Sequence, residues 1–173
     1  MALSPVPIDP TKFKDRDFKF QKIAWSLYEV DHKEVKGILR VLAVPINIFE
    51  VPLPPEMLPP GNPAPIFGWT TQAVVSFKNL GKKGPPNPQT ITQEDYLKSK
   101  REDITSSVTT QDEPFNEYII GGNPALLLRA KTVLTKAEWI VGQTNVFGDP
   151  ALWVNHDTSH STSELKLGDL TSR

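Results

Sequence analysis

Two long segments rich in apolar residues dominate the pattern of hydrophobic and polar positions along the chain. The first runs from Gly37 to Val51 and reads GILRVLAVPINIFEV. Apolar residues on both alternating faces are typical of a strand that is covered on both sides. Because Pro45 has no N–H to donate to a ladder, we expect a bulge or a switch between sheets at this position.

The second apolar segment, Leu126 to Ile140, reads LLLRAKTVLTKAEWI and resembles the first. Placing Leu39-Arg40 on Leu128-Arg129 also places Val44 on Val133. Each segment is followed by a similar turn, GNPA from position 61 and GDPA from position 148, and then by apolar residues. We interpret the two segments as copies of one duplicated unit.

Local rules and the internal similarity disagree about the second segment. Asn123-Pro124 suits a helix start, apolar residues recur at helical spacing from Leu126, and Gly142 suits a helix end. The first segment, with its proline and β-branched residues, is a poor helix former. If the copies are related, the second segment is a strand, and this is our prediction; the alternative is an α+β fold with a helix at 124–141.

The flanking patterns predict further elements. Alternation before the first apolar segment, up to Val30, predicts a strand with a bulge near Leu27. The charged run DHKEVKG predicts a hairpin turn into Gly37. A strand is predicted over IFGWTTQAVVSF, paired with the first apolar segment. Thr92 followed by Asp95 has capping-box spacing and predicts at most a short surface helix.

Together these elements predict a mostly β protein. The fold class is a sandwich or barrel built from two related strand-loop-strand units, with at most one short helix. The units are expected at 12–88 and 118–162, joined by a polar linker at 89–117 that holds the possible short helix. Residues 1–11 are expected to form an extended, proline-rich arm, and 163–173 a polar tail.

Composition limits the kinds of metal site and binding partner that this chain can have, and it indicates a cellular location. The 173 residues include no cysteine, which excludes disulfides and thiolate metal sites. Nineteen basic and twenty acidic residues give a net charge of −1, so no overall field attracts nucleic acid or anionic lipid. Neither a standard signal peptide nor a membrane-spanning apolar run is present. We therefore expect a soluble protein, either cytoplasmic or part of a virion or other assembly.

Residues 12–22 interleave cations with aromatic side chains. This pattern suits base stacking over a groove that attracts phosphates. It equally suits an edge strand or strap whose phenylalanines pack inward while its lysines discourage edge pairing. Asp15 and Asp17 dilute the charge, and we favour the strap. The candidate nucleic-acid-binding residues are Lys12, Phe13, Lys14, Arg16, Phe18, Lys19, Phe20 and Lys22.

The sequence contains weak candidates for a metal site in His156, Asp157 and His160. In an extended segment the two histidines would lie roughly 13 Å apart, too far to share one ion. No phosphate-binding, dinucleotide or hydrolase motif is present. We therefore predict no catalytic residues, no metal and no cofactor.

We accordingly predict a non-catalytic interaction or assembly protein that docks to other chains through its arms and sheet edges. Its expected partner is protein, as a homo-oligomer or as a subunit of a larger assembly. The first alternative is a nucleic-acid-binding β module that uses residues 12–22. The second is a β domain that binds a small ligand or a metal.

Overall fold

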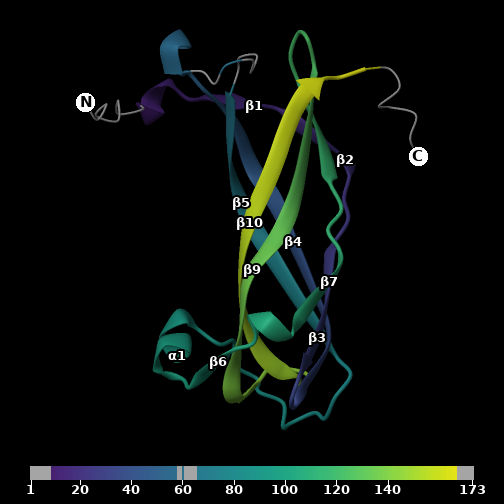
Figure 1. The fold of residues 1–173 in the computed structure, drawn as a ribbon. Helices are drawn as coiled ribbons and strands as arrows, with labels where there is room; N and C mark the ends of the chain where they lie inside the picture. The colour runs from purple at the N-terminus through teal and green to yellow at the C-terminus, as the bar shows by residue number, and fades with distance from the viewer. Residues whose placement is uncertain (1–8, 58–59, 61–65, 167–173) are drawn as a thin grey trace.

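The computed structural model describes residues 9–57, 60 and 66–166. Within these ranges the strands form two five-stranded antiparallel sheets that face each other as a sandwich, with one short α-helix and no closed barrel (Figure 1). The prediction of a mostly β fold is confirmed. The second apolar segment is strand β9 (Leu126–Thr144), so the alternative with a helix at 124–141 is wrong.

The first sheet, sheet A, is organised around β4 (Val35–Val51), which contains the first apolar segment. β5 pairs with β4 along its full length, while β3 and β1 share the other edge of β4. β7 pairs with β3. The bounds of these four strands are β1 Lys14–Arg16, β3 Ser26–His32, β5 Ile66–Asn79 and β7 Val108–Asp112.

The second sheet, sheet B, is organised in the same way around β9. β10 pairs with β9 along its length, β8 and β6 share the other edge of β9, and β2 pairs with β8. The bounds are β2 Phe18–Lys22, β6 Arg101–Asp103, β8 Asn116–Ile120 and β10 Pro150–Glu164. The helix α1 (Gln93–Lys98) and three 3-10 turns, η1 (Pro10–Lys12), η2 (Pro55–Met57) and η3 (Thr105–Ser107), complete the described elements.

The two halves of the chain therefore share one topology. Strands β1 to β5 and strands β6 to β10 follow each other in the same order and make equivalent pairings. The exception is the second strand of each half, β2 or β7, which pairs in the sheet of the other half. The registers agree with the alignment of Leu39 and Leu128: Ser26 lies opposite Val41, and Asn116 lies opposite Ala130. Repeated topology is what a duplication predicts; common ancestry of the halves stays a prediction.

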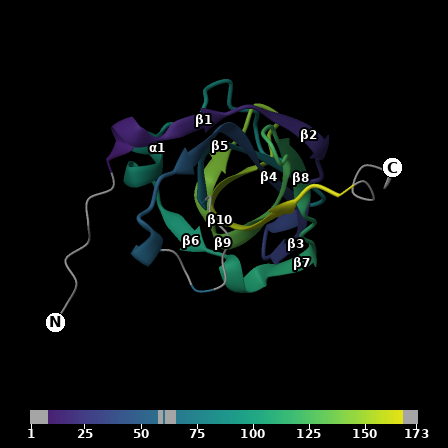
Figure 2. The ribbon, with the colours of Figure 1, turned by 90° about the horizontal axis from the view of Figure 1, so that it is seen from above.

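The exchange of second strands ties the two sheets together. β1 belongs to sheet A and β2 to sheet B, and the two form one continuous band when the molecule is seen along its long axis (Figure 2). At the opposite end, β6 pairs in sheet B and β7 in sheet A. Neither half is a closed unit by itself, because its second strand finds its hydrogen-bonding neighbour in the other half.

Most local features predicted from sequence are present, although only Lys33 and Glu34 of the predicted turn DHKEVKG form the turn and its other residues belong to β3 and β4. The β4–β5 register shifts between Pro45 and Asn47, and the β3–β7 register shifts at Leu27, so both predicted bulges are confirmed. β3 and β4 form a hairpin whose turn includes Lys33 at φ 43°. Thr92 and the Asp95 side chain form a reciprocal capping box at the start of α1.

The segment 89–117, between the two predicted units, contains strands as well as the predicted short helix. This segment was expected to be a polar linker, and it contains α1 but also β6 and β7, which pair in sheets B and A. Its residues lack an apolar alternation because β6 is short and most of β7 is exposed. Residues 1–8 of the arm, 167–173 of the tail and the GNPA turn at 61–64 lie outside the described residues.

Among the described residues, the core includes two clusters, each with residues from both halves. Tyr28 and Leu39 of sheet A pack with Ala137 of sheet B in one cluster, and Ile48 of sheet A packs with Tyr118 of sheet B in the other. The two tyrosines are each 1% exposed. Burial raises the pKa of both phenols to about 12, with Glu113 adding to the effect at Tyr28.

Candidate interaction surfaces

The basic and aromatic segment 12–22 forms the band across the end of the sandwich. Phe13 stacks on Phe49 with ring centroids 5.0 Å apart, and Phe18 packs edge-on against Tyr118 at 6.3 Å. These aromatic rings therefore pack against side chains of β4 and β8. Phe20, 57% exposed, offers the more open ring, although it also contacts Tyr118 edge-on.

The cations of this segment divide into two groups. The Arg16 guanidinium reaches Glu50 at 2.8 Å and donates to the Gly121 carbonyl at 2.7 Å, so it links β4 to the loop that follows β8. Four lysines are exposed: Lys12, Lys14, Lys19 and Lys22. The packing of Phe13 and Phe18 and the exposure of the lysines are those expected of a strap, but Phe20 is exposed. The nucleic-acid hypothesis depends on the exposed lysines and Phe20.

The candidate metal residues lie along β10 without converging. His156 and His160 are on one face of the strand and Asp157 on the other, as strand alternation requires. The His160 ring instead lies edge-on to Trp69 of β5 at 4.1 Å between centroids, and burial lowers its pKa. Within the described residues, no group of three or more histidine, cysteine or acidic side chains could hold a metal ion.

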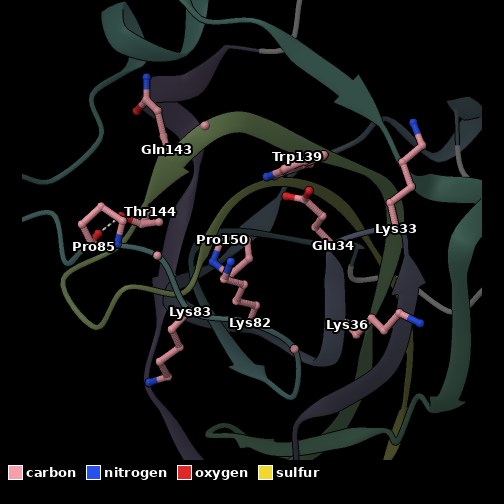
Figure 3. Close-up of a pocket in the computed structure, with 13 residues that line it drawn as sticks. Lys33, Glu34, Lys36, Lys82, Lys83, Pro85, Trp139, Gln143, Thr144 and Pro150 are labelled. Atoms are coloured by element: carbon pink, nitrogen blue, oxygen red, sulfur yellow. Dashed lines mark hydrogen bonds between the residues drawn. The ribbon is translucent and has the colours of Figure 1, made fainter.

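A pocket of about 540 Å³ opens at the end of the molecule that carries the β3–β4 turn. Its walls come from that turn, from the loop at 81–85, from the end of β9 and from the start of β10, with Trp139 and Pro150 among its apolar surfaces (Figure 3). Lys33, Lys36 and Lys83 line it but point away from its middle, whereas Glu34 lies beside Trp139 (Figure 3).

Three of the four lysines that line this pocket, Lys33, Lys36 and Lys83, form ion pairs with acidic side chains. Lys33 donates to Glu102 at 2.6 Å, and this bond, with a smaller contribution from His32, lowers the pKa of that carboxyl group. Lys83 lies 3.4 Å from Asp149 Oδ1, a buried oxygen that has no hydrogen-bond donor among the described residues. Lys82, the fourth lysine of the lining, forms no ion pair among the described residues, and Glu34 adds a carboxylate to the same lining.

The outer edge of β5 is a long, exposed strand edge. Among the described residues β5 pairs with β4 alone, although it is fourteen residues long. Every residue from 70 to 76 is exposed, including Val74 and Val75 at 44% and 42%, which lie on opposite faces of the strand. Ile46, at the neighbouring bulge in β4, is 56% exposed.

The sequence did not reveal this edge. From Gly68 to Phe77 the chain has no charged residue. An uncharged segment of β-branched and aromatic residues is more typical of a central strand, because exposed edges usually carry lysine or proline that prevents pairing with other chains. The prediction that this strand pairs with the first apolar segment is confirmed, but the absence of a second neighbour is visible only in the sheet order.

Comparisons with protein-family models, with curated proteins and with solved structures found no match. In the part of the chain that the structure describes, no helix has the length and apolar character needed to cross a membrane. The fold class is that of a two-sheet antiparallel β protein, and its function is inferred from its own residues.

Proposed function

We propose that this chain is a non-catalytic protein interaction module that captures an extended segment of another polypeptide on the free edge of β5. The observation that carries the proposal is the free edge of β5, which has no charged residue from Gly68 to Phe77 and is exposed from 70 to 76. Alternate N–H and C=O groups of an edge strand point away from its single neighbour. An added strand satisfies these groups and gains affinity from the backbone, with specificity from alternate side chains.

The side chains along this edge support the same role. Val74 and Val75 expose apolar surface on both faces of β5, and Ile46 adds more beside the strand. An incoming strand would cover part of this surface and remove it from water. No acidic or basic residue in this part of the strand opposes pairing by charge repulsion.

The pocket at the end with the β3–β4 turn supports a second candidate function, binding of a small ligand. Its volume of about 540 Å³ falls in the range of ligand sites, and Trp139 and Pro150 offer apolar contact. Three of its four lysines form ion pairs and Glu34 adds a carboxylate, so the lining presents both signs of charge to a ligand. For this reason we place the β5 edge first.

A strand-addition assay tests the proposed function. A fluorescent peptide carrying residues 66–79 is titrated with the protein, and binding is followed by anisotropy. Wild type and a charge-matched control with Ser159→Lys and Ser161→Lys, on the exposed part of β10, are expected to bind. A variant with Val74→Lys and Val75→Lys is expected to lose at least tenfold in affinity. Equal binding by all three proteins, or binding by none, would contradict the proposal.

A further inference from the structure

We propose that the partner strand is β5 of a second copy of this chain, so that two molecules pair antiparallel about a two-fold axis and form a symmetric dimer. This inference rests on the proposed function, because it names the occupant of the same edge. An interface between identical surfaces closes on itself and produces a dimer of defined size.

Symmetry restricts the register of such a pair. A two-fold axis normal to the sheet keeps every side chain on its own face, so one residue must lie opposite its own copy. Ala73 is the small residue near the middle of β5. With Ala73 at the axis, Val75 lies opposite Thr71 of the second copy, and Phe77 lies opposite Trp69. These are β-branched and aromatic cross-strand pairs, which stabilise antiparallel sheets.

Charge favours self-pairing of β5. With Ala73 at the axis, Lys78 lies opposite Gly68. None of the opposed residue pairs from 68 to 78 brings two like charges together. β10 occupies the corresponding outer place in sheet B and offers the comparison. The middle residue of β10 is Asp157, and self-pairing about the middle would place this carboxylate against its own copy. Like charges directly opposite each other destabilise a strand pair.

The difference between β5 and β10 also selects a closed assembly. Because the two strands are equivalent in topology, pairing of β5 with β10 of the next molecule would be head-to-tail and would continue into an open chain. The polar outer half of β10, with Asp157, His160 and Glu164, is poorly matched to the uncharged β5 edge. The dimer through β5 leaves both β10 edges facing solvent.

The exposed part of β5 is accessible to a second strand. Sheet B approaches β5 where His160 meets Trp69, and from 70 to 76 both faces of β5 are exposed. From residue 70 to residue 76, the backbone and side chains of β5 are therefore accessible to a second β5 strand. This second strand would cover Val74 and Val75, which are exposed on opposite faces of the strand.

Cysteine cross-linking tests the register, because the chain contains no cysteine. Opposed residues of an antiparallel pair have Cα atoms about 4.5–5.5 Å apart, within disulfide range. Ala73→Cys is expected to form a disulfide-linked dimer under mild oxidation. The control Ser159→Cys, exposed on β10, is expected to stay monomeric under denaturing electrophoresis.

Sedimentation of the wild type and of the Val74→Lys, Val75→Lys variant gives the second readout. Wild type is expected to be a dimer and the variant to have a dimer dissociation constant at least tenfold higher, with unchanged circular dichroism. A wild-type monomer at all concentrations would overturn the dimer, and if the 66–79 peptide still binds, the proposed function survives it. A dimer that Ala73→Cys does not cross-link, or species larger than a dimer, would also overturn the inference.

Discussion

The backbone N–H of Ala43 in β4 donates a hydrogen bond to the hydroxyl of Thr132 in β9 at 3.1 Å, and the two residues occupy equivalent places in the two halves of the chain. Ala43 lies four residues after Leu39, and Thr132 lies four residues after Leu128. The contact therefore falls where the two halves meet, at the centre of the sandwich.

Side chains from the facing sheet fill the gaps between short strands at this centre. The β3 register on β4 ends at Val41 and the β1 register begins at Ile48, and Ala43 lies between them. In the matching gap on β9, the Ser26 hydroxyl donates to the Thr132 carbonyl at 2.7 Å, and the Leu134 N–H donates to the Tyr28 hydroxyl at 3.0 Å. Buried backbone groups without a strand neighbour are satisfied in this way.

Thr132→Val removes the hydroxyl while it keeps the shape of the side chain. Thr132 is 2% exposed, so the Ala43 N–H would lose its partner away from water. We expect the free energy of unfolding to fall by about 1–3 kcal/mol, measured by urea denaturation. Thr132→Ser keeps the oxygen and is expected to lose less, about 1 kcal/mol for one methyl group. Equal losses in both variants would show that the hydrogen bond is not responsible.

Alkaline pH is expected to destabilise the protein through Tyr28 and Tyr118. The folded-state pKa of each phenol is raised from 10 to about 12, so the folded state holds protons that the unfolded state releases. This stabilisation is complete below pH 10 and is lost between pH 10 and 12, at about 1.4 kcal/mol per pH unit for each tyrosine. Denaturation curves across this range, with tyrosinate absorbance, measure the effect.

The matched control for the alkaline transition replaces both tyrosines with phenylalanine. The double variant removes both titrations, so its stability should fall less steeply from pH 10 to 12 than that of the wild type. Tyr28→Phe alone is also expected to lower stability at neutral pH, because the Leu134 N–H and Glu113 lose a partner. Identical slopes in wild type and double variant would contradict the assignment.

Gly148, in the β9–β10 turn, and Gly142, in β9, share one φ angle and together test the packing of this turn. Gly142 and Gly148 both have φ of 79°, which costs a residue with a Cβ about 1–2 kcal/mol. A Cβ at Gly142 would meet nothing within 4 Å, whereas at Gly148 it would lie 2.4 Å from the Gly84 carbonyl oxygen. We expect Gly148→Ala to lower the melting temperature clearly more than Gly142→Ala. Equal shifts would mean that the 81–85 loop is not held against this turn.

Binding to single-stranded oligonucleotides tests the alternative function of residues 12–22. Phe13 and Phe18 already pack on other aromatic rings, and Asp15 and Asp17 lie among the lysines. We therefore expect no salt-dependent mobility shift for the wild type at low ionic strength. A shift that weakens with salt, and that is lost when Lys12, Lys14 and Lys19 are replaced by alanine, would favour the nucleic-acid function.

Within the second half, the sequence carried two conflicting signals about β9. The spacing of Leu126, Ala130 and Val133 suits a helix, yet the segment is a strand. Tertiary pairing with β8 and β10 overrides the local preference, because it satisfies the backbone of β9 on both edges for much of its length. The internal similarity to β4 gave the correct answer, since it reflected the fold and not local propensity.

Among the candidate surfaces, the sequence identified residues but not their surroundings. Residues 12–22 were recognised as an aromatic and basic segment, but their contacts depend on Phe49 and Tyr118, which lie far along the chain. His156 and His160 were expected to lie too far apart to share an ion, and the strand places them on one face without a third ligand among the described residues. The β5 edge had no sequence signal of its own.

The sequence by itself determined the features that depend on neighbouring residues. Proline at position 45 specified a bulge because it lacks an N–H, Thr92 with Asp95 specified a helix start, and alternating apolar residues specified strands. Beyond the β3–β4 hairpin and the β4–β5 pair, only the tertiary structure decided which strands lie side by side. The exchange of β2 and β7, the contact of Ala43 with Thr132 and the free edge of β5 all depend on pairing between distant segments, whose hydrogen bonds form between backbone groups that every sequence shares.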